Sequence, residues 1–125
     1  MKEKRDGLII NVSSWSGNHV SLLSGVSYTS SKHALNAMTE TINMKYCNLG
    51  IRATALCPGE VATAILDKRP KKLSIEQKNK MLQPDDLGQT IVFLCQMPKH
   101  VCINELTISP TWHRRYIADL GIEEL

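Results

Sequence analysis

The sequence predicts a parallel α/β protein, and three observations support this class. Short apolar runs that are rich in β-branched residues begin near positions 7, 51 and 101. The segments between them show helical spacing of apolar residues and are long enough for the right-handed crossovers that parallel strands require. The composition, with 42% hydrophobic and 22% charged residues over 125 positions, is that of one folded domain. It excludes collagen-like, low-complexity and charge-driven disordered classes.

The first half of the chain contains the clearest elements. Residues 7–14 form an apolar run closed by two serines, which is typical of a strand buried on both faces of a parallel sheet. Residues 15–27 are rich in Gly and Ser and are expected to form a loop. Residues 28–48 contain neither Pro nor Gly, and their apolar positions recur every three or four residues, which predicts an amphipathic helix. Gly50 suits the left-handed position that ends such a helix.

The second half repeats this alternation less clearly. Residues 51–57 predict a second strand, which is stopped by Pro and Gly. The polar segment that follows includes a basic stretch at 68–72, interpreted as a solvated part of a substrate loop, and a short helix over 74–81 with Ser74 and Gln77 as a capping box. A Pro followed by two Asp opens a helix over 84–96. Residues 101–109 predict a third strand, and a short amphipathic stretch ends the tail.

Charge, hydropathy and cysteine content narrow the function. A net charge of +3 is too small to indicate a nucleic-acid or membrane partner. The apolar stretch near the N-terminus is too short for a signal peptide, so a cytoplasmic protein is expected. The four cysteines form no C-x-x-C pair and no His lies at zinc-finger spacing, so we interpret them as buried reduced thiols and predict no metal site.

Tyr28 and Lys32 are the first residues that indicate chemistry. They lie one helical turn apart and therefore share a face. An ammonium beside a phenol favours the phenolate, and such a tyrosine can act as general acid and base toward an alcohol or ketone. The pair alone is a weak signal, because an exposed Tyr and Lys often occur four residues apart by chance.

Two predicted strand ends strengthen this interpretation. Chemistry in open α/β sheets gathers beyond the carboxyl ends of the strands. Ser14 closes the first strand, where its hydroxyl can bond a substrate carbonyl oxygen or, alternatively, cap a backbone group. The second strand ends at Pro58 and Gly59, which turn the chain sharply. Beyond them, the Val61 amide and the Thr63 hydroxyl are suited to a polar ligand group.

In this order and spacing, the motifs resemble the short-chain dehydrogenase/reductase superfamily. They are Asn11-Val-Ser-Ser-x-x-Gly17, Tyr28-x-x-Ser-Lys32, Gly50-Ile-Arg52 and Pro58-Gly-x-Val-x-Thr63. The resemblance is strongest over residues 7–63 and continues more loosely to residue 108.

The resemblance implies an NAD(P)(H)-dependent oxidoreductase that interconverts a small alcohol and a carbonyl compound by hydride transfer. Tyr28 would be the acid/base, Ser14 would orient the substrate oxygen, and Lys32 would assist Tyr28 and bind the nicotinamide ribose. The Val61 backbone and Thr63 would bind the carboxamide. The residues implied in cofactor binding are Tyr28, Lys32, Pro58, Gly59, Val61 and Thr63.

The resemblance also implies that part of the family domain is missing. No G-x-x-x-G-x-G pattern occurs in the sequence, and the family's glycine-rich fingerprint and first strands would precede residue 1. We therefore expect a partial Rossmann-like, doubly wound parallel sheet of about three strands. Residues 1–125 would be the C-terminal catalytic half of a single domain whose N-terminal nucleotide-binding half is missing. Such a chain would bind only the nicotinamide half of NAD or NADP, lack the adenine-binding motif and be inactive alone.

An alternative function follows from the same expectation. The chain would be a non-catalytic member of the superfamily that folds only by pairing with itself or with another family chain. The exposed sheet edge and the helix over 28–48 would form the contact, so a homo-oligomer is expected. Neither the segment 64–83 nor the tail identifies a particular substrate.

Overall fold

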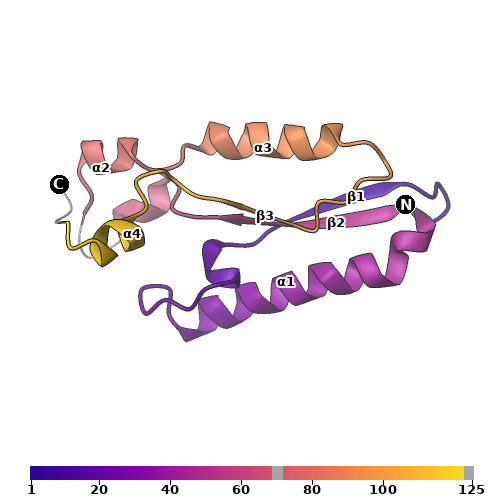
Figure 1. The fold of residues 1–125 in the computed structure, drawn as a ribbon, viewed down its shortest axis with the longest axis horizontal. Coiled ribbons are helices and arrows are strands. Elements are labelled where there is room, and N and C mark those ends of the chain that lie inside the picture. The colour runs from indigo at the N-terminus through magenta and orange to yellow at the C-terminus, as the bar shows by residue number, and fades with distance from the viewer. Residues whose placement is uncertain (69–71, 123–125) are drawn as a thin grey trace.

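The computed structural model describes residues 1–68 and 72–122, which form a three-stranded parallel sheet flanked by helices (Figure 1). The strands are β1 (Gly7–Val12), β2 (Ile51–Pro58) and β3 (Glu105–Ile108), in the order β1-β2-β3. Residues 69–71, most of the predicted basic stretch, lie outside the described residues. The helical elements are η1 (Trp15–Gly17), α1 (Val26–Tyr46), η2 (Cys47–Leu49), η3 (Ala64–Lys68), α2 (Ile75–Asn79), α3 (Pro84–Gln96) and α4 (Arg114–Asp119).

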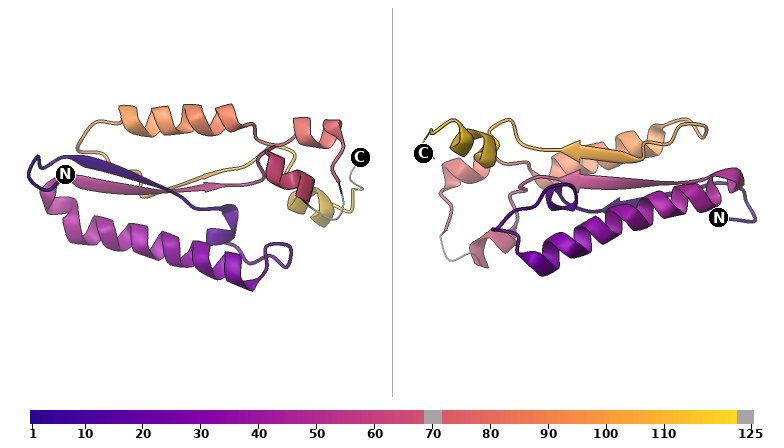
Figure 2. Two further views of the ribbon diagram at one scale, coloured as in Figure 1. Left: turned by 180° about the vertical axis from the view of Figure 1, so that it is seen from behind. Right: turned by 60° about the horizontal axis from the view of Figure 1, so that its bottom comes forward.

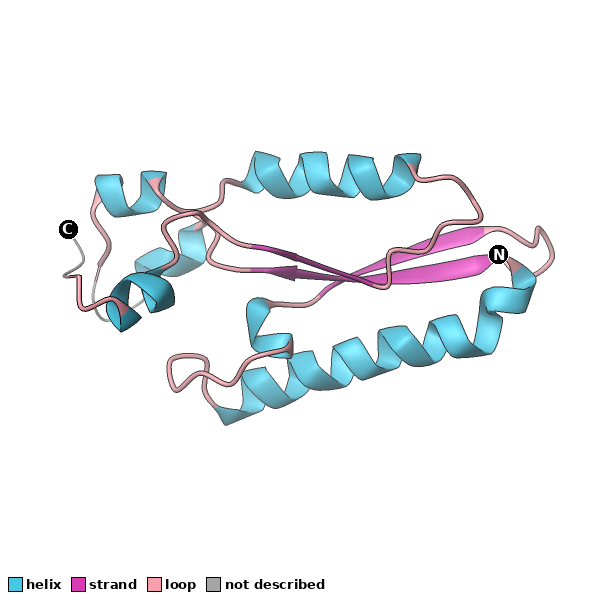
Figure 3. Ribbon diagram, in the orientation of Figure 1, coloured by secondary structure: helices cyan, strands magenta, loops and turns pink. Residues whose placement is uncertain are grey.

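The helices form one layer on each side of the sheet. Helix α1 covers one face and α3 the opposite face, and the views from behind and from below agree (Figures 1 and 2). All three strands run in the same direction. The short helices α2 and α4 lie toward their carboxyl ends, joined by loops (Figure 3). The carboxyl edge of the sheet is therefore surrounded by turns and short helices rather than by long elements.

The core is centred on β2. Every residue of this strand except Arg52 is buried, and Ala53, Leu56 and Cys57 have no solvent exposure. The first strand differs from the sequence prediction of a strand buried on both faces. Residues of β1 are half-buried and Val12 is 51% exposed, because β1 pairs only with β2 in the described structure.

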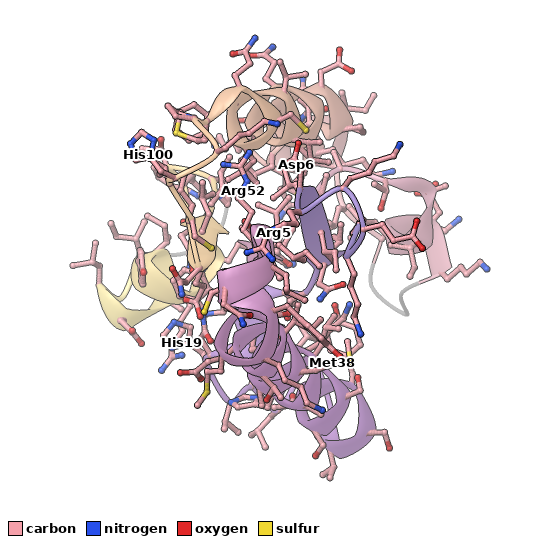
Figure 4. The ribbon with its side chains drawn as sticks, turned by 90° about the vertical axis from the view of Figure 1, so that its right-hand side faces the viewer. Arg5, Asp6, His19, Met38, Arg52 and His100 are labelled. Carbon is pink, nitrogen blue, oxygen red and sulfur yellow. The ribbon has the colours of Figure 1, made fainter. Side chains whose placement is uncertain are left out.

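Arg52 connects β2 to the end of α3. Its Nη1 donates to the carbonyl oxygens of Pro98 at 2.6 Å and Val101 at 2.7 Å, and its Nη2 donates to that of Met97 at 3.0 Å. Figure 4 shows Arg52 on the α3 side of the sheet, with Asp6 nearby. A guanidinium is suited to this task because its donors lie in a fixed plane.

The long helix starts and ends close to the predicted bounds. It begins two residues before the predicted start and passes at Cys47 into the short turn η2. Gly50 ends this turn with a φ of 67°, and a Cβ there would overlap the Arg5 carbonyl oxygen. The predicted role of Gly50 is confirmed, because only glycine adopts this conformation without strain next to another backbone.

The fully buried residues of α1 are polar, which the apolar periodicity did not predict. Thr29 and Thr39 are its buried residues, and Thr39 Oγ1 accepts a bond of 2.9 Å from Asn11 Nδ2. By contrast, Met38 is 50% exposed and Met44 is 76% exposed. Figure 4 shows Met38 on the side of the molecule away from Arg52. The helix was predicted correctly, and its side toward the sheet combines half-buried apolar residues such as Leu35 and Ile42 with hydrogen-bonded polar ones.

Asn43 takes the place of a missing length of strand β3. Its Nδ2 donates to the Ala53 carbonyl oxygen at 2.8 Å, and its Oδ1 accepts from the Ala53 amide at 2.6 Å. The third strand was predicted over 101–109, but its pairing starts only at Glu105 opposite Ala55. Asn43 therefore satisfies the edge of β2 before β3 begins.

We expect Asn43→Leu to lower the free energy of unfolding by about 2–3 kcal/mol. The similar-sized side chain leaves the amide of Ala53, a residue with no exposure, without its partner, and it leaves the Ala53 carbonyl oxygen with only the 3.6 Å bond from the Cys102 thiol. Urea unfolding measures the loss. Thr41→Ala is the matched control, because the Thr41 hydroxyl bonds the Ala37 carbonyl on the exposed side of the same helix. Equal losses in the two variants would contradict this account.

The predicted starts of the second-half helices are also observed. Helix α3 spans the predicted residues, with Pro84 in its first turn and Asp86 accepting from the Gln83 amide at 2.7 Å. Helix α2 begins after Ser74, which forms the predicted capping box with Gln77, but it ends at Asn79 rather than at residue 81. The sequence predicts these helix starts because each depends on residues within one turn of the chain.

Candidate active site

The candidate site lies where the carboxyl ends of β1 and β2 meet the first turns of α1. The Ser13 amide donates to the Leu56 carbonyl oxygen at 2.7 Å and so extends the pairing of these strands past Val12. The chain then leaves the sheet at Ser14 and turns into η1. The pairing of β1 with β2 therefore fixes the position of Ser14.

Ser14 forms the N-cap of η1. Its Oγ accepts a bond of 3.1 Å from the Ser16 amide. This is the capping arrangement that was considered as the alternative to catalysis, but the two roles are compatible. A hydroxyl that accepts one bond still has its own proton to donate to a second oxygen.

Lys32 and Tyr28 lie together on α1, beside the end of β1. Lys32 Nζ donates to the Val12 carbonyl oxygen at 2.9 Å and lies 5.6 Å from the centroid of the Tyr28 ring. Tyr28 is 46% exposed. The ammonium is thus fixed from the sheet side, while the tyrosine ring remains accessible to a ligand.

The turn after Ser14 packs tightly against α1. A Cβ on Gly17 would lie 2.7 Å from both Asn36 Nδ2 and Ser13 Oγ, and the Ser13 hydroxyl donates to the Lys32 carbonyl oxygen at 3.3 Å. Asn36 was not identified from the sequence. The sequence feature that could have identified Asn36 is its position one turn after Lys32 on the same helical face.

The residues after β2 lie at the same carboxyl edge of the sheet. The Gly59 amide donates to the Ile108 carbonyl oxygen at 2.7 Å, and a Cβ on Gly59 would lie 3.2 Å from side-chain atoms of Ser109 and Pro110. Little room remains for any other residue there. Pro58, which ends β2, is buried.

Val61 forms an isolated parallel bridge with Leu82. The bridge uses the carbonyl of Glu60 and the amide of Ala62. Because successive amides of an extended chain point to opposite sides, the Val61 amide points away from Leu82. Thr63, two residues later, is exposed.

The cysteines are all free thiols. Burial raises the pKa of the Cys57 thiol, so it remains protonated near neutral pH. The prediction of reduced thiols holds for all four, but that of burial holds for Cys57 alone, since Cys47, Cys95 and Cys102 are exposed.

Within residues 1–68 and 72–122, no three His, Cys, Asp or Glu side chains gather as metal ligands. Over the same residues, no helix has the length and apolar character needed to span a bilayer.

A parallel α/β sheet with polar residues at its carboxyl edge is the arrangement in which nucleotide-binding folds hold their ligands. Residues 1–74 match the family model described as short chain dehydrogenase, and the chain belongs to this family of NAD(P)-dependent oxidoreductases.

Similar proteins with curated names support the assignment. The human dehydrogenase/reductase SDR family member 11 is 34% identical over 121 residues, covering 89% of this chain and 46% of that protein. An uncharacterized oxidoreductase of Staphylococcus aureus is 31% identical over 110 residues, covering 88% and 45%. The chain therefore spans about half the length of the curated relatives it matches.

Solved structures show the same fold. A β-ketoacyl-[ACP] reductase from Bacteroides thetaiotaomicron superposes with a TM-score of 0.71 at 32% identity, covering 94% of this chain and 46% of that one. An alcohol dehydrogenase from Thermococcus sibiricus, complexed with 5-hydroxy-NADP, superposes with a TM-score of 0.72 at 26% identity, covering 90% and 45%.

The family match corrects two sequence-based expectations. It assigns residues 1–74 to the nucleotide-binding half of the family fold. The prediction of a C-terminal catalytic half whose nucleotide-binding half is missing is therefore wrong, and the three-stranded sheet is a partial Rossmann-like fold that includes that half. The prediction that only the nicotinamide half of NAD or NADP would be bound is wrong for the same reason. Both errors came from treating the missing glycine-rich fingerprint as evidence for a missing half.

Proposed function

We propose that this chain acts as an NAD(P)(H)-dependent oxidoreductase that interconverts an alcohol and a carbonyl compound, with Tyr28 as the acid/base. The observation that carries this proposal is the placement of Lys32. Its Nζ is held at 2.9 Å by the Val12 carbonyl oxygen and faces the Tyr28 ring. This arrangement joins the end of a strand to the helix that bears the tyrosine.

The proposed chemistry assigns one task to each side chain. A bound nicotinamide supplies or accepts the hydride at the substrate carbon. During reduction, the Ser14 hydroxyl bonds the substrate oxygen and the Tyr28 hydroxyl gives its proton to that oxygen. The ammonium of Lys32 stabilises the phenolate that remains. Oxidation of the alcohol reverses these steps, with the Tyr28 phenolate accepting the proton.

We assign the segment after β2 to the nicotinamide. In the proposal, the Val61 amide, which points away from Leu82, and the Thr63 hydroxyl bind the carboxamide. Pro58 and Gly59 line the nicotinamide ring, and the close packing at Gly59 leaves little room for a larger residue there. Tyr28 and Lys32 contact the nicotinamide ribose. Both NAD and NADP are compatible with these contacts.

The proposed substrates are small carbonyl or alcohol compounds. This substrate class agrees with the printed names of two similar proteins, a β-ketoacyl-[ACP] reductase and an alcohol dehydrogenase. Nucleic acids and membranes are not proposed as partners, because the net charge of +3 is small.

A second candidate function rests on the exposed faces of the fold. Along α1, Val26 is 84% exposed and Met44 is 76% exposed, and β1 pairs on one edge only within the described residues. These features favour a chain that pairs with a second copy or with another family member and acts without catalysis. Homo-oligomerisation through the edge of β1 and the outer face of α1 belongs to this proposal.

Cofactor titration separates the two candidates. We expect the fluorescence of NADH or NADPH to change on binding and the bound reductant to be consumed when a carbonyl compound is added. Lys32→Met should weaken nicotinamide binding by about 10–100-fold, the loss expected for a charged hydrogen bond. Lys45→Met is the matched control, because Lys45 is exposed in the last turn of the same helix. Oligomers that bind neither nucleotide would favour the second function.

A further inference from the structure

Four aromatic rings gather where the Ser14 turn meets the C-terminal helix. Trp15 stacks on His19 with ring centroids 4.3 Å apart, and His113 stacks on Tyr116 at the same distance. The two pairs touch each other, because the Trp15 ring lies 4.5 Å from that of His113 and 5.9 Å from that of Tyr116. We call these four residues the ring cluster. It joins segments that are about a hundred positions apart in the sequence.

The ring cluster attaches α4 to the Ser14 turn, and an ion pair attaches the same helix to the residues after β2. In this ion pair, Arg114 Nε donates to Glu60 Oε2 at 2.6 Å and Arg114 Nη2 donates to Glu60 Oε1. Glu60 follows β2, so the ion pair attaches α4 to the segment that is proposed to bind the nicotinamide. The rings tie the same helix to Trp15, the residue directly after Ser14. Helix α4 thus bridges both halves of the carboxyl edge.

His113 is the buried titratable group of the ring cluster. It is 8% exposed, and its Nδ1 has no hydrogen-bond partner in the described part of the chain. Burial lowers its pKa below 6.5. Among the charged groups around His113, Glu60 raises this pKa, whereas Arg115, His19 and Arg114 lower it further. The carboxylate that opposes the lowering is already paired with Arg114.

We propose that His113 is a pH-sensitive latch that holds α4 on the Ser14 turn while its imidazole is neutral and releases the helix when it gains a proton. The neutral ring packs against Trp15 and Tyr116. An imidazolium at the same place has two N–H donors, of which Nδ1 has no acceptor among the described residues, so it requires solvent.

The direction of the pH effect follows from the two states of the latch. The released state exposes His113, whose pKa is then about 6.5. The latched state has the lower pKa, so it binds the proton more weakly. The latch is therefore fully stabilised above about pH 6.5 and loses this stabilisation as the pH falls toward the pKa of the latched state. The release of α4 does not depend on the proposed oxidoreductase function. A change in substrate turnover caused by the release would depend on it, through the proposed role of Ser14.

Trp15 reports the release directly. The chain has two tryptophans, so Trp112→Phe leaves Trp15 as the fluorophore. We expect one transition in its emission between about pH 8 and pH 5, with a midpoint below that of a free histidine. The protection of the Ile117 amide, whose N–H bonds the His113 carbonyl oxygen at 3.0 Å, should fall at low pH when its exchange rate is divided by the intrinsic rate at each pH. The protection factor falls by up to tenfold for each pKa unit between the latched and released states.

Two variants assign the transition to a single ring. His113→Phe keeps a flat ring without a titratable nitrogen and should remove the transition. His19→Gln is the matched control, because His19 also stacks on Trp15 but is not the buried ring, and it should leave the transition in place. A transition that survives His113→Phe, or that disappears only in His19→Gln, overturns the proposal.

An NMR titration of His113 in the unsubstituted chain tests the latch even if a variant fails to fold. A midpoint at or above about 6.5 would mean that the cation–π attraction of Trp15 holds the proton in place, and it would overturn the proposal. A lower midpoint that coincides with the change in Trp15 emission supports it. None of these readouts requires a cofactor, so failure of the latch is distinguishable from failure of the proposed oxidoreductase function.

Discussion

Tyr28→Phe is expected to lower carbonyl reduction by about 10²–10⁴-fold, the range that a positioned general acid contributes. The substitution removes the phenolic proton and leaves the ring. Lys32 keeps its bond to the Val12 carbonyl oxygen, so the helix and the ammonium stay in place. Nicotinamide binding should therefore weaken far less than the rate of substrate reduction falls, because in the proposal Lys32 still contacts the ribose. Stopped-flow oxidation of bound NADPH, with a carbonyl substrate in excess, separates the two quantities.

Tyr46→Phe provides the matched control for this experiment. Tyr46 ends the same helix, and its ring lies 4.7 Å below Lys2 Nζ, so it also pairs a phenol with an ammonium. It stands at the opposite end of α1 from Lys32, away from the carboxyl edge, and its loss should leave the rate unchanged. If Tyr28→Phe retained the full rate, another group would have to supply the proton, and the proposed role of Tyr28 would be wrong.

The sequence predicted the parts of the fold that are determined within one turn of the chain. The capping box of Ser74 and Gln77, the Pro84 start of α3 and the left-handed Gly50 were all located correctly. Each depends on neighbouring backbone groups, so the residue type carries the information. The same holds for placing Tyr28 and Lys32 on one helical face, where the structure has them 5.6 Å apart, ring centroid to Nζ.

The sequence could not reveal which long-range contacts complete the structure. Apolar periodicity suggested that α1 buries Met38, yet its buried positions are threonines and its asparagines bond the sheet. Periodicity reports the polarity of side chains, whereas the packing face depends on partners far along the chain. The shortening of β3 has a similar origin, because Asn43 occupies the edge of Ala53. The ring cluster could not be predicted from the sequence either, because no sequence motif links His113 to Trp15.

The second large effect is expected for Arg52→Met, which should lower the free energy of unfolding by about 2–3 kcal/mol. Arg52 is half-buried and makes three charge-assisted bonds to the carbonyl oxygens of Met97, Pro98 and Val101. These carbonyls lie at and just beyond the C-terminal end of α3, where the helix dipole favours a positive charge. A methionine retains the apolar stem but none of the donors, so α3 loses its main polar attachment to β2. Urea unfolding measures the loss.

Two comparisons show whether the guanidinium itself is responsible. Arg52→Lys keeps the charge but replaces the planar donors with a single ammonium, so it should recover only part of the lost stability. Arg5→Met is the matched control, because the Arg5 Nη2 bonds one exposed carbonyl, that of Asn48, at 2.6 Å. We expect its effect to be close to zero, because an exposed bond exchanges readily with water. Full recovery by lysine would show that charge alone holds α3, whereas equal losses at Arg5 and Arg52 would contradict the role of the three-carbonyl contact.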